Sequence, residues 1–382
     1  MYRQFARDIL PVAVMVSTFG VLLQVLLFGR ALLEALDPAG DAVFACIALL
    51  PGILLAPAMR RWSGAIFVAG NAAMFGSGWL TILLVANQGL PGHVSLAVPL
   101  GVFLAGAVLV MGTGLQYCGH VVLGAPLPAQ RAALIVIATS LCTVIFPLVK
   151  IELEFTAYFA LGCIACSVNL LLFGISGGQG NDSLEGELSS LPAAPAKKGA
   201  GGILTLVVAI LSLLIAHVSY YLGQTTIYAA ERTVWVWPGA ALAGGLYLVA
   251  RKYTAKNFLP LLAPVAAFAC VGLAMAGAPW GYGWEHALLV GCTYAFVLLS
   301  FLEVVPRWSP SNPRWVGLFF GVVGWFTVVC LVIVGYGGGI PSYSSDIPPV
   351  LVIMVYCCVG LVFAGMLQIY LFNSLARRSE ST

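Results

Sequence analysis

The chain has 382 residues, of which 61% are hydrophobic and only 8% are Asp, Glu, Lys or Arg, and its formal net charge is +3. Soluble domains carry a charge on about a quarter of their residues, so this composition excludes an ordinary water-soluble protein. The basic residues are scattered in pairs, which excludes a basic face for direct contact with nucleic acid. We therefore expect an integral membrane protein whose first partner is the lipid bilayer.

Apolar runs follow one another along the whole chain. Each has about 20 residues, which at about 1.5 Å per residue is enough to cross a hydrocarbon core of about 30 Å. The first run is too long for the core of a signal peptide, so we expect it to be retained as a membrane helix. The pattern predicts an all-α integral membrane protein of about twelve transmembrane helices, with eleven as the alternative count. The runs cover residues 9–32, 42–59, 63–86, 94–118, 130–150, 155–175, 202–224, 234–250, 258–278, 284–305, 314–337 and 348–374.

One segment, 177–201, interrupts the series after six runs. It is rich in Gly, Ser, Pro and charged residues, and such a segment cannot bury enough apolar surface to fold. We predict a flexible cytoplasmic linker there, between an N-terminal six-helix bundle, residues 1–176, and a C-terminal six-helix bundle, residues 202–382.

Lys and Arg alternate between the two predicted sides of the membrane. Cytoplasmic loops of membrane proteins collect these residues. With the N-terminus in the cytoplasm, all but three of the 17 Lys and Arg residues fall in predicted cytoplasmic segments, the exceptions being Arg30, Lys150 and Arg232. A wrong helix count would break this alternation. The pattern predicts a multi-pass protein of the cytoplasmic (inner) membrane with both termini in the cytoplasm.

Aromatic residues cluster at the predicted helix ends. Trp235, Trp237 and Trp284 fall at external ends, and Trp62 and Trp308 at internal ones. Trp is enriched where a membrane meets water, so we interpret these side chains as interface anchors.

Known catalytic and metal-binding motifs are missing from the sequence. The ten cysteines lie almost entirely within the apolar runs, and Cys163 and Cys166 have CxxC spacing without a nearby His or carboxylate. No Ser-His-Asp, HExxH or paired-carboxylate pattern appears. We therefore expect no enzyme, no metal site and no cofactor.

Two basic loops occupy equivalent places in the predicted halves. The stretch PGILLAPAMRRWSG (51–64) contains Gly52, Arg60 and Arg61. Its counterpart in the second half is GGLYLVARKYTAKN (244–257), with Gly244, Gly245, Arg251, Lys252 and Lys256.

This arrangement of six helices, a linker, six helices and paired loops resembles the major facilitator superfamily. The loop between helices 2 and 3 of that superfamily reads Gly-x-x-x-Asp-Arg-x-Gly-Arg-Arg, and the present chain lacks its Asp and second Gly. The resemblance implies a carrier fold built from repeats, with a central cavity lined by helices 1, 4, 7 and 10. It also implies that Arg60, Arg61, Arg251 and Lys252 lie in gating loops.

Polar side chains recur at helical spacing in the runs that would line this cavity. Such side chains should face protein or a water-filled cavity, because lipid cannot satisfy them. Helix packing is the alternative for each, since Ser and Thr often bond to the preceding turn and Gln or Tyr can join helix contacts. His217 is the strongest candidate because further polar residues follow it closely. The candidate solute-binding residues are Gln24, Thr113, Gln116, Tyr117, His217, Tyr220, Tyr221, Gln224 and Thr293.

No Asp, Glu, Lys or Arg falls at the midplane of any predicted helix. Proton- or ion-coupled carriers usually need such a group. Our leading hypothesis is a carrier that moves a small neutral or apolar solute by alternating access. One alternative is a facilitator-like membrane sensor that works with a separate LuxR-type transcriptional regulator. A non-transporting subunit of a membrane complex is another.

Overall fold

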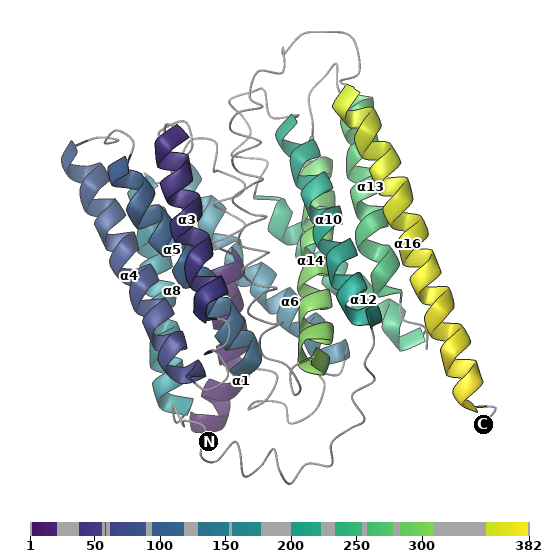
Figure 1. Ribbon diagram of the computed structural model, residues 1–382, viewed down its shortest axis with the longest axis horizontal. Helices are drawn as coiled ribbons and strands as arrows, with labels where there is room; N and C mark the ends of the chain where they lie inside the picture. Colours follow the sequence, from purple (N-terminus) through teal and green to yellow (C-terminus); the bar gives the residue numbers. More distant parts are fainter. Residues whose placement is uncertain are drawn as a thin grey trace. The chain divides into compact units, whose positions relative to one another are not determined.

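The computed structural model describes residues 2–20, 38–55, 58, 62–88, 94–117, 129–152, 155–176, 200–222, 234–253, 258–277, 283–308 and 349–380. Within these ranges every regular element is a helix and no strand is present (Figure 1). The elements are α1 (Tyr2–Val14), the π-helical turn η1 (Met15–Gly20), α3 (Pro38–Leu55), α4 (Ser63–Gln88), α5 (Val94–Tyr117), α6 (Ala129–Thr143), α7 (Ile145–Glu152), α8 (Phe155–Ser176), α10 (Ala200–Leu222), α12 (Val236–Tyr253), α13 (Leu259–Gly277), α14 (Trp284–Trp308) and α16 (Pro349–Glu380).

The apolar runs of the sequence fold as helices throughout the described part of the chain. Six of these helices are long and apolar enough to cross a membrane. The all-helical, membrane-type prediction is therefore confirmed, whereas a count of twelve spans stays a prediction. Residues 314–337, predicted to be a further helix, and most of the predicted linker lie outside the described residues. The six spans are Ser63–Ala86, Leu96–Gly114, Gln130–Val149, Thr156–Ser176, Leu259–Ala276 and Ile353–Tyr370.

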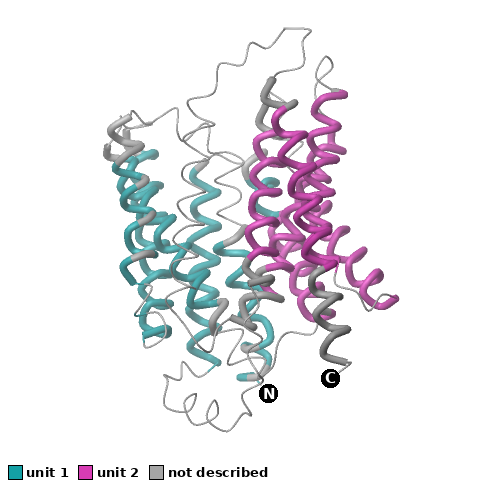
Figure 2. The backbone as a smooth tube through the Cα atoms, turned by 45° about the vertical axis from the view of Figure 1, so that its right-hand side comes forward, with its two compact units in different colours: residues 1–126, 145–196, 305–338 teal, residues 127–144, 197–304, 339–382 magenta. Residues whose placement is uncertain are grey.

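The chain divides into two compact units (Figure 2). Unit 1 comprises residues 1–126, 145–196 and 305–338, and unit 2 comprises residues 127–144, 197–304 and 339–382. The predicted bundles follow chain order, whereas the observed grouping assigns α6 to unit 2. The reason is that α6 packs along α12, where Gly244 approaches the side chain of Ile137.

Unit 1 is organised around α5, which contacts α3, α4 and the α1–η1 segment. Most of this helix is buried. Gly70 of α4 and Gly106 of α5 allow the two backbones to approach closely, because a Cβ atom on Gly106 would lie 2.7 Å from the carbonyl oxygen of Gly70. Small residues permit this kind of contact in membrane helices.

In unit 2, glycines allow a similar close contact between α12 and α14. A Cβ atom on Gly239 would collide with the carbonyl oxygen of Leu288, and one on Gly291 with the carbonyl oxygen of Val236. The two glycines thus let each helix rest on the backbone of the other. This close approach brings the start of α12 beside the first turns of α14.

The two units share a packing scheme. In unit 1, α8 packs against α1 and α4, and in unit 2 α16 packs against α10 and α13. In terms of the predicted runs, the sixth helix of each half contacts the first and third helices of that half. A hydrogen bond repeats as well, since Asn169 of α8 donates to Ser17 of η1 and Gln368 of α16 donates to Thr205 of α10.

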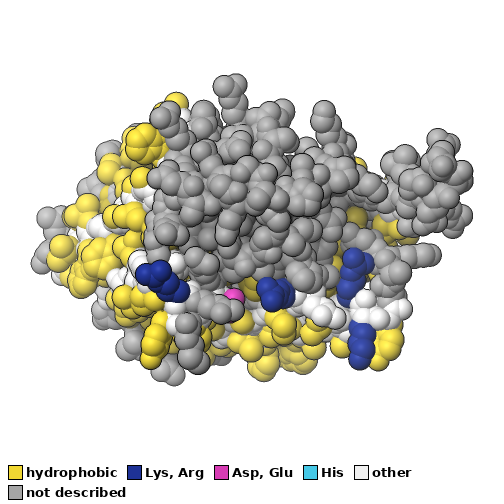
Figure 3. All heavy atoms as spheres, turned by 90° about the horizontal axis from the view of Figure 1, so that it is seen from below, with side chains coloured by type: hydrophobic (Ala, Val, Ile, Leu, Met, Phe, Trp, Pro, Cys, Tyr) yellow, Lys and Arg dark blue, Asp and Glu magenta, His cyan; other side chains and the backbone are white. Residues whose placement is uncertain are grey.

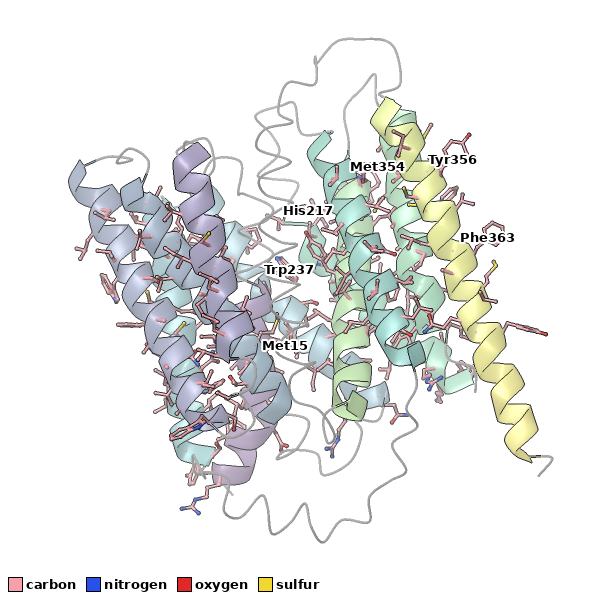
Figure 4. All side chains as sticks on the ribbon, viewed as in Figure 1. Met15, His217, Trp237, Met354, Tyr356 and Phe363 are labelled. Carbon is pink, nitrogen blue, oxygen red and sulfur yellow. The ribbon has the colours of Figure 1, made fainter. Side chains whose placement is uncertain are left out.

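Large apolar side chains cover the outside of the helices. On α16 they follow a three- and four-residue spacing, which places them on one face. Tyr356 is 73% exposed and Phe363 66% exposed, and both side chains point away from the rest of unit 2 (Figure 4). A surface of this kind fits a lipid environment better than water.

Charged side chains are confined to helix ends in the described part of unit 2. Arg131 belongs to the first turn of α6, and Arg251 and Lys252 belong to the last turn of α12. Figure 3 shows Lys and Arg side chains at the surface on the face that is seen from below. Ionised groups avoid the apolar middle of each helix because desolvating them there is costly.

The glycine contact between α12 and α14 can be tested by adding one methyl group. Gly291→Ala should lower the thermal unfolding midpoint of the purified protein in detergent, since overpacking a helix contact costs about 1–3 kcal/mol. Gly245→Ala on α12 is the matched control, because a Cβ atom there meets nothing within 4 Å. This control should leave the midpoint unchanged or raise it, as Ala favours helix by up to about 1 kcal/mol over Gly. Equal midpoints for the two variants would contradict the close approach.

Candidate functional site

Several polar side chains buried in unit 2 gather where α10, α12 and α14 meet. His217 of α10 and Tyr294 of α14 lie 2.9 Å apart, measured from the imidazole Nδ1 to the phenol Oη. Both side chains are buried, with His217 3% and Tyr294 0% exposed. The shared hydrogen can lie on either atom, so this pair can present a donor or an acceptor to a third group.

A second hydrogen bond links the same two helices. Ser219 Oγ lies 2.7 Å from the carbonyl oxygen of Ala216 and 3.2 Å from His286 Nε2. A carbonyl oxygen only accepts, so the single hydrogen of Ser219 serves Ala216. The hydrogen of the other bond must then come from the imidazole, which assigns it to Nε2 of His286.

Trp237 completes this group of residues, which we call the unit 2 cluster: His217, Ser219, Trp237, His286 and Tyr294. The Trp237 ring packs against the Tyr294 ring, with centroids 6.0 Å apart. Its indole Nε1 is fully buried and has no hydrogen-bond partner. Leaving a buried donor unpaired costs about 1–3 kcal/mol, so this N–H is a place where a ligand atom would be stabilised. Figure 4 shows His217 and Trp237 on their helices.

Local sequence explains why these side chains meet. His217 and Ser219 end a long apolar run in α10, where they cannot reach water and must bond across to α14. Trp237 lies two residues before Gly239, whose lack of a side chain allows α12 to lie against the α14 backbone. The glycine contact therefore positions the indole next to Tyr294.

The two candidate threonines bond within their own helices. Thr113 Oγ1 donates to the carbonyl oxygen of Leu109 at 2.7 Å, and Thr293 Oγ1 donates to that of Val290 at 2.7 Å. This is the usual behaviour of Thr in a membrane helix. Both side chains are fully buried, and their hydroxyl hydrogens are already used.

Several candidate residues cannot be placed. Gln24, Arg60, Arg61 and Gln224 lie outside the described residues. Gln116, Tyr117, Tyr220 and Tyr221 belong to described helices, but their side chains are outside the described part of the structure. Of the proposed gating residues, Arg251 is half-buried and Lys252 is exposed, with its Nζ 5.9 Å from the centre of the Tyr253 ring.

The aromatic anchors behave differently from one another. Trp235 is 46% and Trp284 51% exposed, and their rings lie 5.9 Å apart, as expected at an interface. Trp237 was grouped with them on sequence, but this assignment is wrong because its side chain is 0% exposed. Position near a helix end does not tell which way an indole points.

Three further polar residues are candidates that the sequence pattern did not single out. Tyr294 was missed although it is a polar aromatic residue within an apolar run, and Asn71 and Asn169 were missed although both carry an amide within such runs. That placement was the available signal, since polar groups in membrane helices need a partner.

Asn71 and Asn169 form a separate polar group in unit 1 together with Ser17, which we call the amide network. Asn169 Nδ2 donates to Asn71 Oδ1 at 3.0 Å and to Ser17 Oγ. All three side chains are 0% exposed. Ser17 lies in the π-helical turn η1, a form that is frequent at functional sites.

Metal binding has no support among the described residues, where no group of three His, Cys, Asp or Glu side chains is close enough to hold an ion. The chain matches no protein-family model and no curated protein. Its function therefore has to be inferred from the polar groups themselves.

The His217–Tyr294 hydrogen bond predicts a specific effect of removing one hydroxyl. Tyr294→Phe should lower the thermal unfolding midpoint, because losing a buried hydrogen bond costs about 1–3 kcal/mol. Thr293→Val on the same helix is the control, since its hydroxyl bonds only within α14. Adding His217→Phe to Tyr294→Phe should cost less than the sum of the two single changes. Strictly additive effects would show that the two side chains do not interact.

Proposed function

We propose that this protein is a carrier of the major-facilitator type that moves a small neutral solute across the membrane by alternating access. The observation that carries the proposal is the unit 2 cluster, in which Trp237 holds an unpaired, fully buried N–H beside the His217–Tyr294 pair. Buried polar groups within apolar helices are costly and are typical of binding sites and transport pathways.

The repeated packing scheme supports the carrier fold. Many carriers consist of two related helical repeats that move against each other. In this chain the sixth helix of each half carries an amide that donates to a hydroxyl on the first helix of that half. Such a recurrence favours a twelve-span, six-plus-six architecture over an unrelated set of helices.

The chemistry of the cluster favours a neutral solute with a hydrogen-bond acceptor. Trp237 Nε1 is a donor only, so it would bind a carbonyl, hydroxyl or ether oxygen of the solute. The His217–Tyr294 pair can donate or accept. Neither Asp, Glu, Lys nor Arg belongs to the cluster, so an ionised solute would find no opposite charge among its residues.

Trp237→Phe removes the indole N–H while keeping a smaller aromatic ring at the same place. The apparent Kd from thermal-shift titration should rise about tenfold, and uptake into proteoliposomes below saturation should fall by a similar factor, which corresponds to the loss of one useful hydrogen bond. Stability without solute should fall, since the smaller ring leaves a cavity in the packed interior, so the loss of binding is read from the apparent Kd and not from the midpoint. The screen would use neutral polyols, amides and sugars, and His217→Ala should also weaken the response.

Trp235→Phe is the matched control, because this indole is partly exposed. Unchanged uptake by the Trp237→Phe variant would contradict the proposed site. A solute that shifts the unfolding temperature without entering vesicles would favour the sensor alternative, and fixed co-purifying proteins would favour the complex-subunit alternative.

We further propose that the protein lies in the cytoplasmic membrane with both termini in the cytoplasm, as the distribution of Lys and Arg indicates. A green fluorescent protein fused after Thr382 should fluoresce, and alkaline phosphatase fused at the same place should be inactive. The same pair of reporters inserted near residue 190 should give the same result. An active phosphatase at either position would contradict this topology.

A further inference from the structure

At each end of the amide network of unit 1, a side chain donates a hydrogen bond to a backbone carbonyl oxygen. Asn71 Nδ2 donates to the carbonyl oxygen of Phe67 at 2.9 Å, and Ser17 Oγ donates to that of Val14 at 3.1 Å. These two carbonyl oxygens fix the direction of every bond between them. Asn71 Oδ1 and Ser17 Oγ are thereby left to accept.

Asn169 is the residue between these two acceptors. Its Nδ2 donates one hydrogen to Asn71 Oδ1 and the other to Ser17 Oγ. Turning the amide over would place Asn169 Oδ1 against Asn71 Oδ1, two acceptors with no hydrogen between them. The orientation of the Asn169 amide is therefore set by the network.

A consequence is that Asn169 Oδ1 faces no protein donor. This oxygen is fully buried and has no hydrogen-bond partner, although the side chain is 0% exposed. Thr18, next to Ser17 in the chain, has no spare hydrogen either, because its hydroxyl donates to the carbonyl oxygen of Val14. A buried acceptor without a protein donor is costly, and an ordered water or a ligand can relieve this cost.

We propose that Asn169 Oδ1 accepts a hydrogen bond from an O–H or N–H group of the transported solute. This inference rests on the carrier function proposed above and narrows its substrate class. The solute then carries a hydrogen-bond donor for Asn169. Neutral hydroxylated compounds and primary amides have such a donor, whereas ethers, tertiary amides and hydrocarbons do not.

Pairs of probes that differ only in the donor test this inference. One pair is glycerol and its tri-O-methyl ether, and the other is acetamide and N,N-dimethylacetamide. Apparent Kd values are measured by thermal-shift titration of the purified full chain, and uptake is measured in proteoliposomes. The wild-type protein should bind the donor-bearing member of a pair about tenfold or more tightly, because the ether or tertiary amide leaves Asn169 unpaired.

Asn169→Leu should bring the two members of a pair to within about threefold of each other, by weakening the donor-bearing one. Ser17→Ala keeps the Asn169 oxygen and should keep the discrimination. Ser167→Ala on the same helix should behave as wild type, because its hydroxyl bonds to the carbonyl oxygen of Cys163 at 3.0 Å. Asn169→Ala replaces the Leu variant if the latter does not purify as a folded protein.

The outcomes separate this inference from the proposed function. Wild-type protein that binds both members of each pair equally overturns the inference without any variant. Discrimination that survives Asn169→Leu also overturns it and indicates that only water fills the site. If neither member of any pair binds or enters vesicles, the carrier function itself fails, and the inference fails with it.

Discussion

Polar groups in these apolar helices have to form their hydrogen bonds inside the protein, because lipid offers no partner. This constraint determines the side-chain hydrogen bonds of both units. Most of the hydroxyl groups satisfy this constraint within their own helix. Thr81, Ser140 and Ser300 each donate to the carbonyl oxygen four residues earlier. Side chains with longer reach, such as His217, Tyr294 and Asn169, bond to another helix instead and so define which helices meet. Trp237 Nε1 and Asn169 Oδ1, like Thr139 Oγ1, are among the buried atoms that find no hydrogen-bond partner in the described part of the chain.

Close backbone contact at glycines makes these bonds possible. The pair Gly239 and Gly291 brings α12 onto α14, and the pair Gly70 and Gly106 brings α4 onto α5. Apolar burial cannot drive helices together inside a lipid environment, where packing and hydrogen bonds must do so. Each unit thus combines a tight glycine contact with a buried polar group. The proposed solute-binding groups would then be held by closely packed helices.

Much of the fold was predictable because hydrophobicity separates lipid from water so strongly. The runs at 63–86 and 155–175 were located within a few residues of the spans Ser63–Ala86 and Thr156–Ser176. Helix facing was harder to predict, since a run that is apolar all round carries no amphipathic stripe. This is why α6 was not expected to pack along α12.

The candidate site was predictable only in part. His217 was identified because it is a polar residue with polar neighbours in an apolar run, and it does bond across helices. The sequence could not show that Tyr294 is its partner, as that depends on the rotation of two helices about their axes. Trp237 was misplaced for the same reason, since an indole near a helix end can point to the interface or into the protein.

Solute counterflow in proteoliposomes tests the proposed function, that the protein moves a neutral solute across the membrane by alternating access. Vesicles that contain the purified protein are loaded with unlabelled glycerol or acetamide and diluted into a trace of the same labelled compound. Alternating access predicts a transient accumulation of label above its equilibrium level, which protein-free vesicles do not show. Binding of the compound without any transient accumulation would contradict a carrier function.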